Sequence, residues 1–114
     1  MKTKKIFQKV VVPGSILLLV SIISFGQTVY DQAKMDSGYA PVNGLKMYYE
    51  IYGNGEPLVL IHGGVGALEM FGPNISALAK THKVIAVDLQ AHGRTADIDR
   101  PLSYELMADD IAAY

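Results

Sequence analysis

The chain has 114 residues, half of them apolar, and a formal net charge of −1. This length limits it to one domain, and the absence of cysteine excludes disulfides, thiolate metal sites, a cysteine nucleophile and a lipid anchor attached through cysteine. Four of the 10 basic side chains lie in the first 26 residues, so the remainder carries 6 basic and 11 acidic side chains. Such a mildly acidic body argues against nucleic acid as a partner.

The first 26 residues have the pattern of a secretory signal peptide. A basic segment at 2–9 precedes a mostly apolar segment at 10–25, and Ser24 and Gly26 supply the small residues that a signal peptidase reads. We therefore expect cleavage before Gln27 and export to the periplasm or the extracellular space. The alternative is an uncleaved membrane anchor, but the apolar segment falls short of the roughly 18 residues that span a bilayer. Residues 27–37 are polar and unpatterned, and we assign them to a spacer.

A β-hairpin is predicted next. Asn43-Gly44 is a strong signal for a two-residue hairpin turn, because both residues tolerate positive φ. Residues 39–42 lead into this turn, and residues 45–52 leave it with partial alternation of apolar side chains. Pro41 cannot donate a ladder hydrogen bond, so the first strand is expected at a sheet edge.

The centre of the chain holds an apolar strand followed by a glycine-rich loop. Residues 58–61 form an unbroken apolar run, which suits a parallel strand buried on both faces. The loop that follows reads His62-Gly63-Gly64-Val65-Gly66. Glycines let a backbone turn sharply and bring its amide groups close to a ligand. A strand that ends in exposed N–H groups is one way to build an oxyanion hole.

The second half of the chain predicts a helix, a strand and a further helix. Pro73 suits a first helical position, and we expect that helix to face the sheet through Ile75, Leu78 and Ala79 and to end at residues 81–83. Residues 84–87 are a second continuous apolar strand, so the strand–helix–strand unit implies a parallel right-handed crossover. Ser103 caps the last helix, whose apolar stripe comprises Tyr104, Met107, Ile111 and Tyr114.

Two segments together resemble the opening of an α/β-hydrolase-fold enzyme. They are the glycine-rich loop at 62–66 and the strand and loop at 84–95, which includes Asp88, His92 and Gly93. In that family the first ends the third strand, and the second spans the fourth strand and its loop. The resemblance implies an α/β fold in which residues 38–114 form the N-terminal part of the hydrolase sheet: an antiparallel hairpin, a β-α-β crossover and the start of a further helix.

The resemblance also assigns roles to individual residues. It places an oxyanion-hole N–H at Gly64, with Val65 as a second candidate, and gives loop-structural roles to His62, Gly63, Asp88 and Gly93. Gly63, Gly64 and Gly66 taken alone could equally make an ordinary turn. Gln90-Ala91 stands where the family commonly has Arg-Gly, a departure that concerns subfamily and substrate more than fold.

No catalytic triad can be identified in the chain. Hydrolases of this fold carry a nucleophile in a G-x-S-x-G elbow, followed by an acid and a histidine, and no serine here has that context. The resemblance therefore implies that the nucleophile, acid and base lie beyond Tyr114 and that this chain alone is inactive. No metal site is expected, because no compact oxygen-ligand loop is present. We expect the remaining aspartates to be solvated: Asp97, Asp99, Asp109 and Asp110.

The sequence thus predicts the N-terminal part of an exported hydrolase. The complete enzyme would hydrolyse a small-molecule ester through an acyl-serine, with water as cosubstrate and no cofactor. It would contact a membrane only through its signal segment. Other chemistries of the same fold remain open, namely epoxide hydrolase, dehalogenase, lactonase and haloperoxidase. A non-catalytic binding or structural module is a further alternative.

Overall fold

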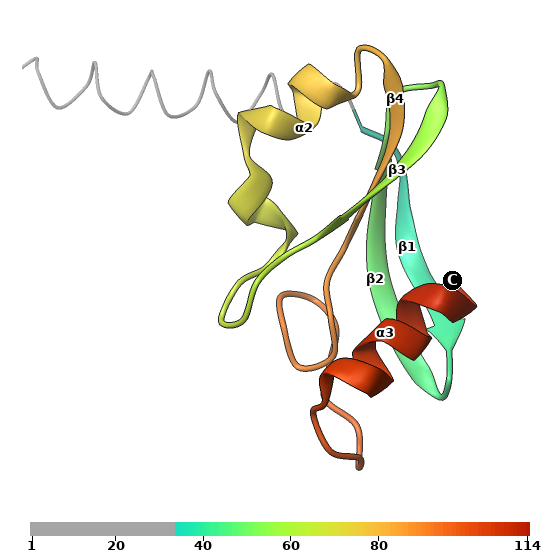
Figure 1. The fold of residues 1–114 in the computed structure, drawn as a ribbon, viewed down its shortest axis with the longest axis vertical. Coiled ribbons are helices and arrows are strands. Elements are labelled where there is room, and N and C mark those ends of the chain that lie inside the picture. Colours follow the sequence, from blue (N-terminus) through green and yellow to red (C-terminus); the bar gives the residue numbers. More distant parts are fainter. Residues whose placement is uncertain (1–33) are drawn as a thin grey trace, which may run out of the picture.

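The computed structural model describes residues 34–114, which form one mixed sheet with helices on its two faces (Figure 1). The strand order is β1-β2-β4-β3. The predicted signal peptide at 1–26 and most of the predicted spacer lie outside the described residues. The elements are β1 (Lys34–Val42), β2 (Leu45–Tyr52), β3 (Glu56–Ile61), η1 (Leu68–Phe71), α2 (Pro73–Leu78), β4 (His82–Val87) and α3 (Tyr104–Ala113).

The predicted hairpin is present and forms one edge of the sheet. Asn43 and Gly44 have φ of 48° and 80°, and Val42 pairs with Leu45 across the turn. Pro41 lies in the edge strand β1, as expected. β1 begins at Lys34, which pairs with Tyr52, so residues 34–37 are strand and were wrongly assigned to the spacer. Their polar sequence carries no alternation signal because cross-strand pairing with β2, not burial, holds them in place.

The two apolar strands differ in their surroundings. β4 lies between β2 and β3, and its residues from Val84 to Val87 are buried. β3 pairs with β4 in parallel, as predicted, but it is the outer strand of the described sheet. Val59 is therefore 39 % exposed and Ile61 50 % exposed. The expectation that this strand is buried on both faces does not hold for the described residues.

Helix α2 is shorter than predicted. It begins at Pro73 but ends at Leu78. His82 and Lys83, expected at the helix end, instead begin β4 and pair with Glu56 and Pro57 of β3. Ile75 is fully buried against the sheet, with Leu78 and Ala79 packed beside it as predicted, in a cluster that contains Tyr48, Tyr52, Leu68, Val84 and Ala86.

The opposite face of the sheet is covered by α3 and the loop before it. Ser103 Oγ caps this helix by accepting a hydrogen bond from Leu106 N at 3.2 Å, as the sequence predicts. The apolar side chains on this face are Val42, Leu45, Met47, Ile85 and Val87, with Ile98 and Ile111 packed against them. The predicted stripe is nevertheless only partly buried, since Tyr104 is 87 % exposed.

The buried side chain of α3 is an aspartate. Asp110 is 1 % exposed, although we expected it in solvent. Arg100 donates to both of its carboxylate oxygens, and Asn43 Nδ2 donates to Oδ1 at 3.1 Å. Arg100 also donates to the buried amide of Gln90. A buried charge needs such partners, and here they tie α3 to the hairpin turn and to the loop after β4.

A second buried carboxylate lies on the α2 face. Glu50 of β2 accepts hydrogen bonds from Lys34 Nζ at 2.8 Å, from Tyr48 Oη at 2.8 Å and from Tyr52 Oη. Burial alone would raise the pKa of Glu50, but the hydrogen bonds from Lys34, Tyr52 and Tyr48 outweigh it and hold that pKa below its ordinary value. Glu50 is therefore a buried, charged carboxylate that anchors the start of β1.

Candidate active site

The candidate site lies where two parallel strands end side by side. Ile61 of β3 pairs with Val87 of β4, so the loops that begin at His62 and Asp88 leave the sheet at the same edge. Ligands of open α/β sheets bind at the carboxyl ends of parallel strands. The topology therefore brings together the two segments that carried the sequence resemblance.

The loop after β3 folds into a tight turn. Gly66 N donates to Gly63 O at 3.2 Å, and Val65 between them has φ of 61°. A β-branched residue rarely adopts this left-handed conformation, which costs about 1–2 kcal/mol. The Val65 side chain is fully exposed, so apolar burial does not offset that cost. Strain of this kind persists where surrounding contacts enforce it, often at functional sites.

Gly64 and Val65, the two predicted oxyanion donors, differ in their hydrogen bonding. Val65 N donates to His92 Nε2 at 3.3 Å. Within the described part of the chain, no group accepts a hydrogen bond from Gly64 N. A Cβ added at Gly64 or at Gly63 would meet no atom within 4 Å, so this backbone borders open space. Gly64 therefore has an available donor, whereas Val65 would have to leave His92 to provide one.

His62 is buried beneath the glycine-rich loop. Its Nε2 accepts a hydrogen bond from Leu89 N at 3.0 Å, and its Nδ1 lies 2.8 Å from Gly63 O. Because Leu89 N–H must donate, Nε2 carries no proton, and the ring proton is on Nδ1, facing the carbonyl. Both ring nitrogens are then engaged by backbone, and neither is positioned to take a proton from a nucleophile.

His92 has the same arrangement in the neighbouring loop. Its Nδ1 lies 2.7 Å from Gln90 O, and its Nε2 accepts from Val65 N. The His92 and His62 rings lie with centroids 5.1 Å apart. No local pattern predicts this contact, because the bond from Val65 to His92 joins residues 27 positions apart.

Asp88, at the end of β4, joins the start of η1 and the loop at Arg94 at the base of the site. It is fully buried, and its carboxylate accepts from Leu68 N at 2.8 Å and from Arg94 N at 2.9 Å. Gly93 has φ of 52° and passes so close that an added Cβ would lie 2.2 Å from Asp88 Oδ2. Thr95 completes the loop by donating to Asp88 O at 2.7 Å and accepting from Tyr48 N at 2.8 Å.

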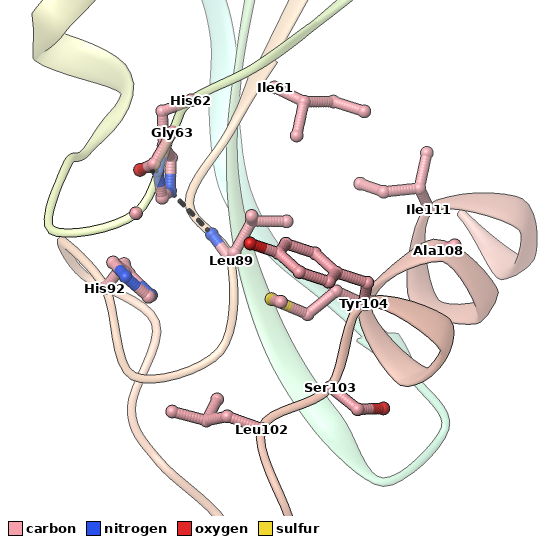
Figure 2. A pocket seen from close by; sticks show the side chains of 12 residues that line it. Ile61, His62, Gly63, Leu89, His92, Leu102, Ser103, Tyr104, Ala108 and Ile111 are labelled. Atoms are coloured by element: carbon pink, nitrogen blue, oxygen red, sulfur yellow. Dashed lines mark hydrogen bonds between the residues drawn. The ribbon is translucent and has the colours of Figure 1, made fainter.

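A pocket of about 710 Å³ opens beside these loops. Figure 2 shows His62, Gly63 and His92 on one side of it and Tyr104, Ala108 and Ile111 of α3 on the other. Leu89 lies between them, and the remaining lining residues are Ile61, Gly64, Leu102, Ser103 and Met107. The lining is mainly apolar, and its polar part comprises the two histidines, the backbone at Gly63 and Gly64, and the hydroxyls of Ser103 and Tyr104. Sequence reasoning did not identify Leu89 or Leu102 as lining residues, because nothing in their local pattern distinguishes them from core positions.

Within residues 34–114, no group of three or more histidine, aspartate or glutamate side chains is arranged to hold a metal ion. Over the same residues, no helix has both the length and the apolar character required to cross a bilayer.

The fold and these loops define an α/β protein with a pocket at the ends of its parallel strands, and comparison with known proteins identifies its family. The chain is 39 % identical over 74 residues to "Putative carbamate hydrolase RutD" of Azorhizobium caulinodans, a match covering 65 % of this chain and 28 % of that protein. It is 37 % identical over 67 residues to the pimeloyl-[acyl-carrier protein] methyl ester esterase of Stenotrophomonas maltophilia, covering 59 % of this chain and 26 % of the esterase. No protein-family model matches.

Solved structures give the same result. An enol-lactonase from Burkholderia xenovorans superposes with a TM-score of 0.62 at 30 % identity, covering 66 % of this chain and 30 % of the lactonase. An epoxide hydrolase from Vigna radiata superposes with a TM-score of 0.64 at 26 % identity, covering 72 % of this chain and 27 % of that enzyme. The chain belongs to the α/β-hydrolase-fold superfamily, as the sequence resemblance indicated. It spans less than a third of the length of these four relatives.

Proposed function

We propose that this chain forms the oxyanion side of the active site of an exported α/β hydrolase that cleaves small-molecule esters. The observation that carries the proposal is Gly64 N–H, which stands at the end of β3 beside an open pocket and has no acceptor among the described residues. A backbone donor fixed in this way can stabilise the negative charge that develops on a carbonyl oxygen during acyl transfer.

The remaining catalytic groups would come from outside the chain. Its 114 residues contain no G-x-S-x-G sequence, and both histidines at the site use Nε2 to accept backbone N–H groups. In hydrolases of this fold the second oxyanion donor is the residue after the nucleophile. One donor contributes about 3 kcal/mol to transition-state stabilisation, and only where a nucleophile is present. The 114-residue chain alone should therefore not turn over an ester.

An ester is the substrate class that the site favours. The pocket is lined mainly by apolar side chains from α3 and from the loops after β3 and β4, which suits the carbon chain of an acyl group. One of the relatives is named as a methyl ester esterase and another as an enol-lactonase, and both names denote cleavage of an ester bond. Water would be the cosubstrate, and no cofactor is required.

Epoxide hydrolysis is the second candidate, because epoxide hydrolases are among the structures that superpose on this chain. The two reactions share the fold, so the nucleophile distinguishes them: a serine favours the ester and an aspartate the epoxide.

Two substitutions at Gly64 test the oxyanion proposal in the enzyme that contains this segment. Gly64 precedes left-handed Val65 in the turn from Gly63 to Gly66, a position that accepts proline. Gly64→Pro removes the N–H, and we expect kcat for p-nitrophenyl butyrate to fall about 100- to 1,000-fold. Gly64→Ala retains the N–H and adds a Cβ in open space, so it is the matched control and should remain active. Equal activity of the two variants would refute the assignment.

A further inference from the structure

The loops after β3 and β4 are joined by two hydrogen bonds of the same kind, running in opposite directions. His62 of the first loop accepts from Leu89 N of the second at 3.0 Å. His92 of the second loop accepts from Val65 N of the first at 3.3 Å. The two imidazole rings lie together between the loops, with centroids 5.1 Å apart. Each loop thus provides one acceptor and one donor to the other.

We infer that His62 and His92 form a histidine clamp that fixes the glycine-rich loop on the β4 loop, and that His92 is a positioning residue for the Gly64 donor. The clamp is a structural claim that stands alone, whereas its catalytic meaning rests on the proposed oxyanion role of Gly64. In this clamp, the histidines hold backbone N–H groups and do not exchange protons with a substrate.

Val65 shows why such a clamp is needed. Its left-handed φ of 61° is unfavourable for a β-branched side chain, and that side chain is fully exposed. The contacts that can hold Val65 in this conformation are its N–H bond to His92 and the turn bond from Gly66 N to Gly63 O. If the bond to His92 is lost, we expect Val65 to relax and the Gly64–Val65 peptide to rotate. The turn from Gly63 to Gly66 must then readjust, which moves the adjacent Gly63–Gly64 peptide and with it the Gly64 N–H.

The clamp also explains why Gly66 must lack a side chain. A Cβ there would lie 2.2 Å from Met70 Sδ, 2.9 Å from Gly63 O and 3.4 Å from His62 Nδ1. The flexible methionine can move, but the Gly63 carbonyl cannot, because it faces His62 Nδ1 and accepts from Gly66 N. The turn is therefore packed directly onto the ring that accepts from Leu89.

NMR of the unmodified chain, uniformly labelled with ¹⁵N, tests the clamp without any substitution. Because each Nε2 accepts an N–H, both rings should be Nδ1–H tautomers at neutral pH. Couplings across the hydrogen bonds should join Val65 N to His92 Nε2 and Leu89 N to His62 Nε2. An Nε2–H tautomer at either ring would overturn the proposal.

Substitutions at His92 then test its positioning role. In His92→Leu we expect the Val65 amide to exchange with solvent about three- to tenfold faster, as the loss of one net hydrogen bond implies, and the Gly64 amide resonance to shift. His92→Gln offers a side-chain oxygen as acceptor and should restore both signals in part. His82→Leu is the matched control, because His82 contacts Thr81 at the start of β4, away from the site. Unchanged Val65 exchange in His92→Leu would overturn the proposal.

Kinetics of the complete enzyme separate this inference from the proposed function. A positioning role predicts that His92→Leu lowers kcat with little change in KM and that His92→Gln recovers part of kcat. Unchanged kcat in His92→Leu, in an enzyme that Gly64→Pro inactivates, would refute the positioning role and leave the oxyanion proposal standing. Both NMR couplings in the chain, together with a complete enzyme that hydrolyses no ester, would support the clamp and refute the proposed function.

Discussion

Gly93 offers a sharp test of the packing beneath the site. It combines a left-handed φ of 52° with the closest approach to the Asp88 carboxylate: an added Cβ would lie 2.2 Å from Oδ2, 2.4 Å from Cγ and 2.5 Å from Oδ1. All three distances are far below a van der Waals contact. Gly93→Ala must therefore displace the Asp88 side chain, which is fully buried.

The cost of Gly93→Ala follows from the contacts of Asp88. A left-handed alanine costs about 1 kcal/mol. Each hydrogen bond to a charged group contributes about 1.5–3 kcal/mol, and the Asp88 carboxylate accepts two, from Leu68 N and Arg94 N. If the displaced carboxylate loses one of them, we expect the free energy of unfolding to fall by about 2.5–4 kcal/mol, a large part of the 5–15 kcal/mol typical of a domain.

Gly44→Ala is the matched control for this prediction. Gly44 also has a left-handed φ, 80°, but a Cβ there would meet nothing within 4 Å. The free energy of unfolding of Gly44→Ala should therefore fall by only about 1 kcal/mol, the cost of a left-handed alanine. Urea unfolding followed by far-UV circular dichroism gives both values, and hydrogen exchange of the Leu68 and Arg94 amides locates the effect. Equal losses in the two variants, with unchanged exchange at both amides, would refute the reasoning.

Three further predictions concern other parts of the chain. The depressed pKa of Glu50 means that its charged form stabilises the fold above the ordinary glutamate pKa of 4.5, and that this stability disappears as the pH falls through the lower folded-state value. The free energy of unfolding should therefore decrease at acid pH, and this decrease should be smaller in Glu50→Gln. An equal decrease in the variant would contradict the role given to the Glu50 charge. Asp110→Leu leaves Arg100 without its buried partner and should cost about 3 kcal/mol, whereas Asp109→Leu, on the exposed side of α3, should cost less than about 0.5 kcal/mol. N-terminal sequencing of exported protein should begin at Gln27; an intact Met1 in the membrane fraction would favour the uncleaved anchor.

Several elements could be predicted from the sequence because their signals are local. The Asn43-Gly44 turn, the cap at Ser103 and the apolar run in β4 each depend on a few adjacent residues. The end of α2 could not be placed in the same way. His82 and Lys83 follow the helix closely, and their pairing with β3 assigns them to a strand.

Only the tertiary structure decided which polar groups are buried and what they contact. Asp110 appears solvated from its sequence, yet it bonds to Asn43, 67 positions away, and to Arg100. The sequence allows the glycine-rich loop and the loop after β4 to be recognised as a pair. It does not reveal that His92 accepts the N–H of Val65 and leaves that of Gly64 available. The physical reason is the parallel pairing of β3 with β4. This pairing places the ends of β3 and β4 side by side, although a helix separates the two strands in the sequence. No local sequence pattern shows which donor will meet which acceptor at that edge.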